Sequence, residues 1–481
     1  MATARRFRGL RIAIGIGLPI ILVAYFLWFA LFPKINGASY AEIVAALPAE
    51  IRTEPPADLL AQARFDEVLK LARSVDPDRS EKLGEWVFHK DGKHSKRPDL
   101  ERFAAATEYV RRCAPIFKKI RAILGAGPLQ FRRDPKNALT DTKPWLTDLV
   151  RAFQSTYQCT EVLSRHGQGR LTIDQILTLL SLDRRMGEAN NDQMSMMTED
   201  ILDGLVVGAI GIEAKDQKVS VDDLRSILRA LLPMPAYGEW AASALRADFH
   251  LVFCRELASN PIETFRSKVS ASRQFHQFFR WAGDVPVGDE AIAGLDADVS
   301  PLAGTYDAVE TVQVCAHYLL GTMANAQRSW ADRDRSYDTW VKRQLVGLPR
   351  IGVKGRSALG YRIQMNTRHN TIGRAILACQ TIQPILAKIQ FNIAALRGAT
   401  TVLVASRIYR FTHGGALPST REAFRSILRQ WPADPFSGKP MIYRPKEQRV
   451  YSVGVDLNDD GGDITSTRDH NATDVGVSLR S

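Results

Sequence analysis

A run of twenty-two mostly apolar residues without a charge stands near the start of the chain, at 12–33. A helix of this length rises about 33 Å, enough to cross the hydrocarbon layer of a bilayer. Four arginines precede the run and only Lys34 closely follows it, so the positive-inside rule places residues 1–11 in the cytoplasm. The sequence therefore predicts a single-pass protein of a bacterial inner membrane, with its bulk periplasmic or extracytoplasmic.

A cleaved secretory signal is the alternative interpretation of the same residues. Such signals carry an apolar core of about 7–15 residues and end in a small-x-small cleavage site. The run at 12–33 is longer, and Asn36-Gly37-Ala38 is a poor version of such a site. We therefore expect an uncleaved transmembrane helix.

The region 40–370 carries apolar residues at helical spacing, and strand-like alternation is nearly absent before residue 440. A capping-box pattern at Thr172–Gln175 predicts a helix that ends near Gly187, and Ser220 predicts the start of another. The buried face predicted for this second helix carries Leu224, Ile227, Leu228 and Leu231. The fold class is therefore mainly α, with an all-α body that is a helical bundle or a solenoid-like array.

The net charge of the chain and its distribution along the sequence indicate which classes of partner it can bind. The net charge of +12 is concentrated in two blocks, 90–136 with thirteen basic and five acidic residues and 328–374 with eleven and three, so each block is +8. Outside the cytoplasm, nucleic acid is excluded as a partner, and the expected partner is a protein or an anionic polymer of the envelope, besides the membrane. The five cysteines form no CxxC pair, and we interpret them as buried free thiols.

The last hundred residues, 376–481, form a separate small α+β unit in our interpretation. The predicted elements are a helix at 376–411, a short helix opened by a capping box at Ser419–Glu422, and two strands at 440–444 and 449–453 joined by a polar turn. An acidic loop follows them.

This order of elements, with the runs Asp434-Pro-Phe-Ser-Gly-Lys-Pro440 and Tyr451-Ser-Val-Gly454, resembles the C-terminal half of type II secretion major pseudopilins over about residues 390–476. The resemblance implies a long helix, a small antiparallel sheet and a loop that binds calcium. As a whole the chain looks like envelope proteins of planctomycete-type bacteria.

The acidic loop also indicates calcium by its own composition. Asp456, Asn458 and Asp460 alternate before Gly461, and Asp463 follows. Calcium takes six to eight oxygen ligands from carboxylates, amides and carbonyls. The predicted ligands are Asp456, Asn458, Asp460 and Asp463, with Asp469 or Asp474 as a further acid. An acidic surface turn without an ion remains the alternative, and a sensor EF-hand is excluded because its twelfth position is Thr467 rather than Glu.

Catalytic candidates are few. His89 and His94 lie among lysines, which disfavours a bound cation, and Cys315 and His317 fall on different faces of a predicted helix. The pair Glu81 and Glu85 beside Trp86 is the basis for an alternative function, a hydrolase of wall glycans or peptides.

Whether the protein is an enzyme is thus uncertain, and we expect that it is not one. The preferred function is a non-catalytic, membrane-anchored envelope protein that binds or scaffolds another macromolecule, in a secretion or pilus-like apparatus.

Overall fold

Most of the chain is described in the computed structural model. The described residues are 34–53, 57–75, 99–131, 144–188, 193–234, 237–259, 305–345, 368–380, 383–464 and 474–480. The predicted membrane segment at 12–33 lies outside them. No helix within these ranges combines the length and the apolar character that a membrane crossing requires.

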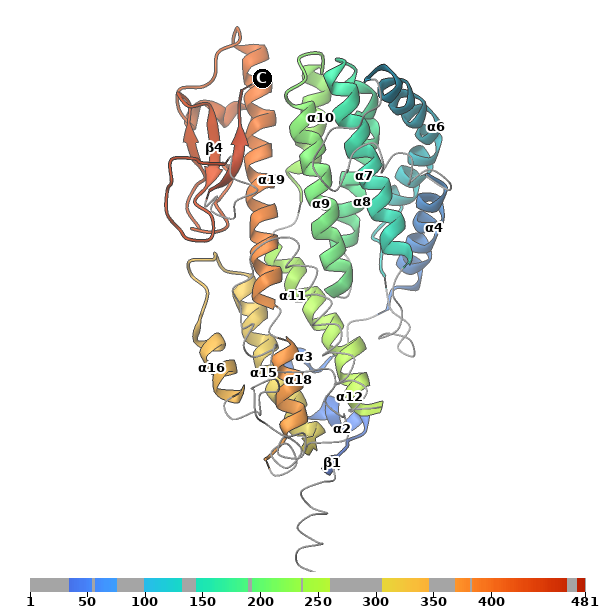
Figure 1. Cartoon of the computed structure of the whole chain (residues 1–481), viewed down its shortest axis with the longest axis vertical. Helices are drawn as coiled ribbons and strands as arrows, with labels where there is room; N and C mark the ends of the chain where they lie inside the picture. The colour runs from blue at the N-terminus through green and yellow to red at the C-terminus, as the bar shows by residue number, and fades with distance from the viewer. Residues whose placement is uncertain are drawn as a thin grey trace, which may run out of the picture. The chain divides into compact units, whose positions relative to one another are not determined.

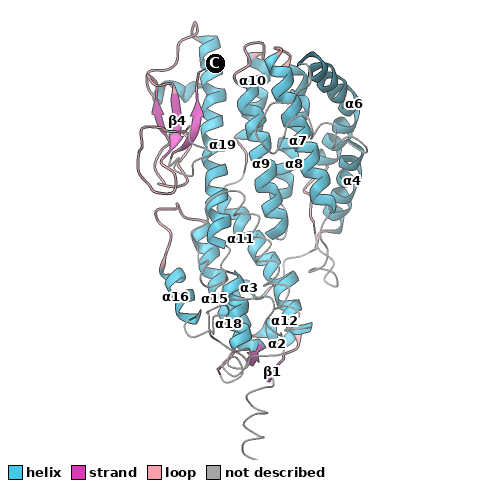
Figure 2. Ribbon diagram, viewed as in Figure 1, coloured by secondary structure: helices cyan, strands magenta, loops and turns pink. Residues whose placement is uncertain are grey.

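The prediction of a mainly helical chain is confirmed (Figures 1 and 2). The prediction that 40–370 is all-α is wrong in one place, because β2 (Thr305–Asp307) pairs there with a strand at Lys34–Asn36. The chain divides into two compact units. Unit 1 comprises 1–53, 252–320 and 335–383, and unit 2 comprises 54–251, 321–334 and 384–481. Each unit is therefore assembled from stretches that are far apart in the sequence.

Unit 1 joins short N-terminal elements to the middle of the chain. Its described elements are β1 (Lys34–Asn36), α2 (Tyr40–Ala45), α3 (Ala49–Arg52), α12 (Arg255–Ser259), β2 (Thr305–Asp307), most of α15 (Ala308–Ala326), α16 (Ser336–Leu345) and α18 (Thr371–Gln380). The strands β1 and β2 pair in parallel, with Ile35 opposite Tyr306. Ser39 begins α2 through a capping box, in which the Glu42 amide donates to Ser39 Oγ (3.3 Å) and the Ser39 amide donates to the Glu42 carboxylate (2.7 Å).

Unit 2 contains a row of helices, one long C-terminal helix and a three-stranded sheet. Its elements are α4 (Leu59–Val75), α6 (Asp99–Gly125), α7 (Pro144–Arg165), the 3₁₀ turn η1 (Gly169–Thr172), α8 (Ile173–Gly187), α9 (Gln193–Glu213), α10 (Val221–Leu231), α11 (Tyr237–Asp248), α19 (Gln383–Thr412), the 3₁₀ turn η3 (Glu422–Ser426), β3 (Ile442–Arg444), β4 (Arg449–Ser452) and β5 (Val475–Ser478). A π-helical segment, η2 (Phe249–Cys254), continues α11 across the boundary with unit 1.

One hydrophobic core runs through unit 2. Buried side chains of α4 to α10 belong to the same packed cluster as Val402 and Leu403 of α19, Phe424 of η3 and Val450 of β4. In Figure 1, α4 and α6 lie at one edge of this unit and the sheet lies at the other, beyond α19. The C-terminal elements therefore share their core with the helices rather than packing only on themselves.

Two predicted helix starts had different outcomes. The start of α10 is confirmed, because Ser220 Oγ accepts from the Asp223 amide (3.1 Å) and the four predicted apolar residues are buried. The span of α8, with its end at Gly187, is also confirmed, but its predicted capping box is wrong. The Thr172 side chain makes no cap; it donates to Gly169 O (2.9 Å) and to Glu213 Oε1 (3.0 Å) inside the core.

The C-terminal predictions were right about the hairpin, partly right about the long helix and wrong about the short capped helix. The long helix predicted at 376–411 is covered by the end of α18 and by α19. Two helices, α18 and α19, stand where one was predicted, and Pro384 is the second residue of α19, where its missing N–H leaves no helical bond unmade. The capping box at Ser419–Glu422 is wrong, since η3 is a 3₁₀ turn without a side-chain cap and is fixed by burial of Phe424. The strands β3 and β4 are confirmed, and β5, which was not predicted, pairs antiparallel with β4.

Candidate functional site

The acidic loop leaves the sheet at the end of β4, and a buried carboxylate fixes this point. Asp434 Oδ1 accepts from the Phe436 amide (2.9 Å) and from the Ser452 hydroxyl (2.5 Å). Its Oδ2 accepts from the Ser437 hydroxyl (2.6 Å) and the Val453 amide (3.3 Å). Asp434 is therefore the residue that ties the Pro435–Gly438 turn to the end of β4.

Substitution of Asp434 by asparagine is expected to lower the free energy of unfolding by about 2 kcal/mol, because one of its two acceptors becomes an N–H₂ group that faces donors. Chemical denaturation of the full chain in a nonionic detergent measures the loss. The matched control is Asp332→Asn, because Asp332 also accepts from a serine hydroxyl, Ser329 Oγ (2.6 Å), but is exposed. Equal stability of the two variants would contradict this role for Asp434.

Two glycines shape a turn within the acidic loop. Gly461 and Gly462 have φ angles of 75° and 77°, a region that side chains disfavour. A Cβ atom on Gly462 would also lie 2.7 Å from the Tyr451 ring. Arg449 Nη1 donates to the Gly462 carbonyl (2.7 Å) and the Gly462 amide donates to Asp474 Oδ2 (2.8 Å), so the turn is held against β4 and the start of β5.

The Asp459 carboxylate is hydrogen-bonded to two side chains of the sheet. Tyr451 Oη donates to its Oδ1 (2.7 Å), and Arg444 Nη2 donates to its Oδ2 (2.8 Å). The tyrosine hydrogen bond, with those from the Gly461 amide and Arg444, lowers the pKa of the Asp459 carboxyl. Asp459 thus links the loop to the sheet.

The predicted ligands Asp456, Asn458, Asp460 and Asp463 are all exposed in this loop. Asp456 Oδ1 accepts from the Asn458 amide (3.2 Å), which turns the chain locally. Within the described part of the chain, no three acidic, histidine or cysteine side chains converge closely enough to hold a metal ion. The predicted ligands therefore share one loop without forming a compact cluster, and Asp469 lies outside the described residues.

Asp474 is the acid that best fits a cation in this region. Its side chain is buried, and Oδ1 has no hydrogen-bond partner among the described residues. Burial raises the pKa of the Asp474 carboxyl, and together with the nearby Asp460, Asp459 and Asp456 carboxylates it brings this pKa to about 6. The sequence offered Asp474 only as one of several further acids; its burial beside the loop depends on β5.

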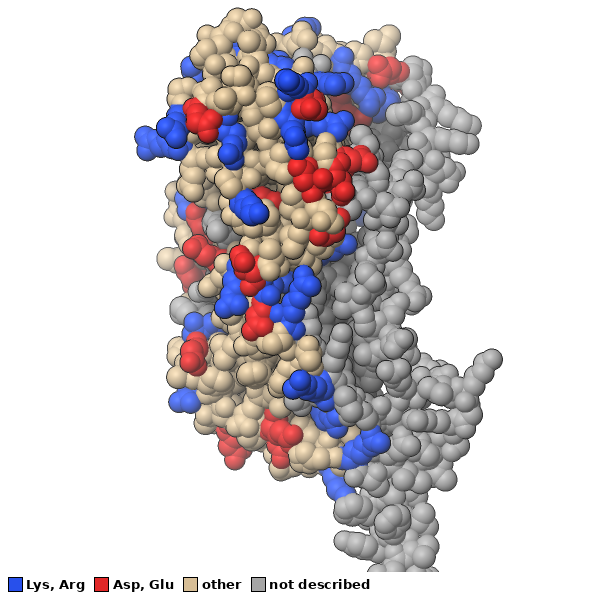
Figure 3. Space-filling model, turned by 90° about the vertical axis from the view of Figure 1, so that its left-hand side faces the viewer, with Lys and Arg blue, Asp and Glu red and all other residues tan. Residues whose placement is uncertain are grey.

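The charge of the molecule is mixed on the face drawn in Figure 3. Lys and Arg side chains lie interspersed with Asp and Glu there, with wide areas of uncharged residues between them. The described residues on this face therefore form no single continuous basic patch.

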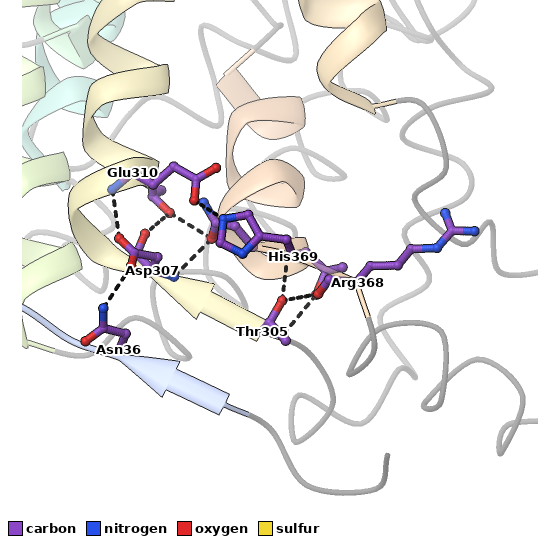
Figure 4. Close-up of polar contacts among 9 residues, drawn as sticks. Asn36, Thr305, Asp307, Glu310, Arg368 and His369 are labelled. Atoms are coloured by element: carbon purple, nitrogen blue, oxygen red, sulfur yellow. Dashed lines mark hydrogen bonds and ion pairs between the residues drawn. The ribbon is translucent and has the colours of Figure 1, made fainter. Parts of the chain in front are cut away.

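A polar network in unit 1 joins three separate segments (Figure 4). Asp307 accepts from the Asn36 side chain (2.8 Å) and from the Glu310 amide (2.9 Å), so it connects β1 to the start of α15. The Asp307 amide donates to Asn370 Oδ1 (3.1 Å). His369 contacts the Glu310 carboxylate, while the Arg368 side chain points away from the network. The network fixes the ends of β1, β2 and α18 to one another.

Two further buried acids join the helices of unit 2. Asp203 of α9 pairs with Arg397 of α19, and Nε lies 2.9 Å from Oδ2. Glu213, at the end of α9, accepts from Thr172 and packs against Gly169, and its Oε2 has no partner among the described residues. Burial raises the pKa of the Glu213 carboxyl to about 8.

Comparison with known proteins gives no assignment. No protein-family model, curated protein or solved structure matches the chain.

The predicted catalytic candidates do not come together. Cys315 is buried, whereas His317 is exposed and contacts the rings of Tyr337 and Trp340. This agrees with the prediction that the two lie on different faces of the helix. The other candidates, Glu81, Glu85, His89 and His94, lie outside the described residues.

Proposed function

We propose that this chain is a non-catalytic, single-pass, membrane-anchored protein of the bacterial envelope that binds or scaffolds another macromolecule, within a secretion or pilus-like apparatus. The uncharged run at 12–33 and the arginines before it support the anchor and its orientation. Buried polar side chains in both units support a scaffold, because they join distant segments. Asp203 pairs with Arg397 and Glu213 accepts from Thr172 in unit 2, and in unit 1 the buried Asn370 side chain accepts from the Asp307 amide. No described residue favours the hydrolase alternative over this function.

Membrane anchoring is tested by expressing the full chain in bacteria and washing the membranes with alkaline carbonate. We expect the chain to stay in the pellet, and a protease added to spheroplasts to digest the helical units. Release by carbonate, or protection from the protease, would contradict the anchor or its orientation.

We further propose that the C-terminal loop binds calcium as a structural ion. The observation that carries this proposal is the buried Asp474 carboxylate, with an oxygen that has no described partner, beside a loop that contains Asp456, Asn458, Asp460 and Asp463. A bound Ca²⁺ would favour the ionised form of Asp474 and offset the repulsion among these carboxylates. It would thereby fix the loop to β4 and β5, as the resemblance to major pseudopilins implies.

Calcium is expected to raise the thermal stability of the full chain in nonionic detergent. At a hundredfold excess over its Kd, the gain is about 2–3 kcal/mol. The affinity should fall below about pH 6, because Asp474 must release its proton to bind the ion. Melting curves with calcium or with a chelator, at pH 5 and pH 7.5, measure both effects.

Asp474→Asn should abolish the calcium-dependent gain. Asp222→Asn is the matched control, because Asp222 is 90% exposed on α10 and distant in sequence from the loop. Its calcium response should equal that of the unmodified chain. A melting curve of the unmodified chain that is the same with calcium and with chelator would overturn the calcium site.

A further inference from the structure

One edge of unit 1 directly follows the predicted membrane segment in the sequence. That segment ends at residue 33, and Lys34 is the first residue of β1. A helix of its length rises about 33 Å, against about 30 Å for the hydrocarbon core and a further 5–7 Å for each headgroup layer. With the proposed anchor in the bilayer, Lys34 therefore lies in the headgroup layer or directly beside it.

The pairing of β1 with β2 brings a distant part of the chain to the same edge. Lys34 is the register partner of Thr305, and paired strands lie about 5 Å apart. The Thr305 hydroxyl donates to the Arg368 carbonyl, and the Thr305 amide donates to Thr371 Oγ1 (3.0 Å). The backbone of Arg368 is therefore within about 10 Å of the backbone of Lys34.

A buried asparagine fixes the backbone next to Arg368. Asn370 has a φ angle of 44°, and the residue is 2% exposed. Its Oδ1 accepts from the Asp307 amide (3.1 Å) and from the Thr311 hydroxyl (3.2 Å). The turn that carries Arg368 is thus held against β2 and the first turn of α15, so its position relative to β1 is defined.

The Arg368 side chain is exposed and extends away from Asp307 and from the rest of this network (Figure 4). It forms no ion pair with any described residue, and the neighbouring acid Glu310 contacts His369 instead. Burial lowers the pKa of Arg374, and the charge of Arg368 lowers it further, whereas Glu310 opposes this. An anion bound beside Arg368 would relieve the repulsion between the two guanidinium groups.

The position of this edge selects a lipid headgroup over other anions. Because Lys34 is continuous with the proposed anchor, headgroup phosphates are always within reach of the residues where β1 and β2 begin. Ile35, on the opposite face of the strand pair from Asn36, is 41% exposed. Among the described residues of unit 1 it is the one exposed large apolar side chain. Exposed apolar and basic side chains together are typical of surfaces that lie in the headgroup layer.

We propose that Arg368 binds the phosphate of an anionic glycerophospholipid in the leaflet next to unit 1, and so holds this edge of the unit against the membrane. The proposal rests on the proposed anchor and deepens it, because it names the lipid class and the residue that contacts the lipid. A guanidinium group binds phosphate through two parallel N–H donors, which also orients the contact.

The test uses the full chain in phosphatidylcholine nanodiscs that contain a trace of photoreactive lipid. The probe is either phosphatidylglycerol or phosphatidylcholine, each with the same diazirine near its phosphate. After irradiation, chymotryptic peptides are analysed by mass spectrometry; chymotrypsin does not cut at arginine, so variants at Arg368 give the same peptides. We expect both probes to label the peptide with residues 34–36, and phosphatidylglycerol to label the peptide with residues 369–371 about fivefold more than phosphatidylcholine does.

Arg368→Glu should remove the preference for phosphatidylglycerol at 369–371 and leave the labelling of 34–36 by phosphatidylcholine unchanged. Arg368→Lys should retain most of the preference, because the positive charge remains. The matched control is Arg335→Glu, which makes the same change in charge at an exposed arginine of unit 1. Arg335 directly precedes α16, which lies higher in unit 1 than β1 in the view of Figure 1. The control should label like the unmodified chain, and melting curves show whether each variant is folded.

Three results would overturn the lipid contact: no labelling of 369–371 by either probe, equal labelling by the two probes, or the same loss of preference in Arg335→Glu and Arg368→Glu. Failure of the proposed anchor is distinguishable from these results. A chain without the anchor is released by carbonate and does not enter the nanodiscs, whereas an anchored chain enters them even if Arg368 binds no lipid.

Discussion

Replacing Arg397 with leucine is expected to lower the free energy of unfolding by about 3–5 kcal/mol. Arg397 and Asp203 are 14% and 2% exposed in their side chains, and they connect α19 to α9. Without the guanidinium, the Asp203 carboxylate would be left buried and uncompensated. Burial already raises the pKa of Asp203 and the charge of Arg397 opposes this, so the variant should also take up a proton at Asp203. Denaturant unfolding of the full chain in nonionic detergent measures the loss.

Two control variants separate the buried pair from a general loss of arginine. Arg165→Leu removes an exposed pair with Glu161 in α7 and should cost less than about 1 kcal/mol. The double variant Asp203→Leu/Arg397→Leu should recover much of the loss, since two apolar residues can replace a buried ion pair. If Arg397→Leu and Arg165→Leu unfold alike, the pair does not stabilise the packing of α19 on α9.

Glu213→Gln is expected to stabilise the protein by about 4 kcal/mol at pH 8, and hardly at all at pH 4.5. In the folded chain Glu213 keeps its proton up to a pKa of about 8, whereas in the unfolded chain it releases the proton above its ordinary value of 4.5. Between these values the folded state binds more protons, so the stability of the unmodified protein falls as the pH rises. Glutamine is neutral throughout and still accepts from Thr172 through its carbonyl oxygen.

Denaturant unfolding of the unmodified protein and of Glu213→Gln, from pH 4.5 to pH 8, measures this difference in stability. Neighbouring charges also contribute to the raised pKa of Glu213. The carboxylates of Asp216 and Asp223 raise it further. Two arginines lie beside these acids: Arg170 pairs with Asp223, and Arg407 lies near Asp216. Glu108→Gln on α6, an exposed acid, is the control and should change stability by less than about 0.5 kcal/mol at either pH. A constant difference between Glu213→Gln and the unmodified chain across this range would show that Glu213 is ionised in the core.

Elements specified by their own residues were predictable from the sequence. The start of α10 at Ser220, its buried face and the pairing of β3 with β4 follow from local capping, helical spacing and a short polar connection. The acidic loop was predictable for the same reason, because its residues are adjacent. In these places the local preference and the tertiary structure agree.

Other elements depend on distant contacts. Thr172 stands at the start of α8, as the capping pattern requires, yet its hydroxyl is taken by Gly169 and by Glu213 of α9. The burial of Asp474 depends on β5, a four-residue strand whose partner β4 precedes it by more than twenty residues. The hydrophobic periodicity of a short stretch of sequence carries no information on such contacts. The buried side of the candidate site could therefore not be predicted.

The parallel pairing of β1 with β2 can form only late in the synthesis of the chain. The ribosome makes Lys34–Asn36 early, but their partner Thr305–Asp307 emerges only after more than half of the chain has been translated. Until then the backbone groups of β1 must be satisfied by water or by a chaperone, because the bonds that complete the strand do not yet exist. Nascent chains stalled before residue 305 should therefore leave Lys34–Asn36 open to proteolysis, and full-length chains should protect this segment.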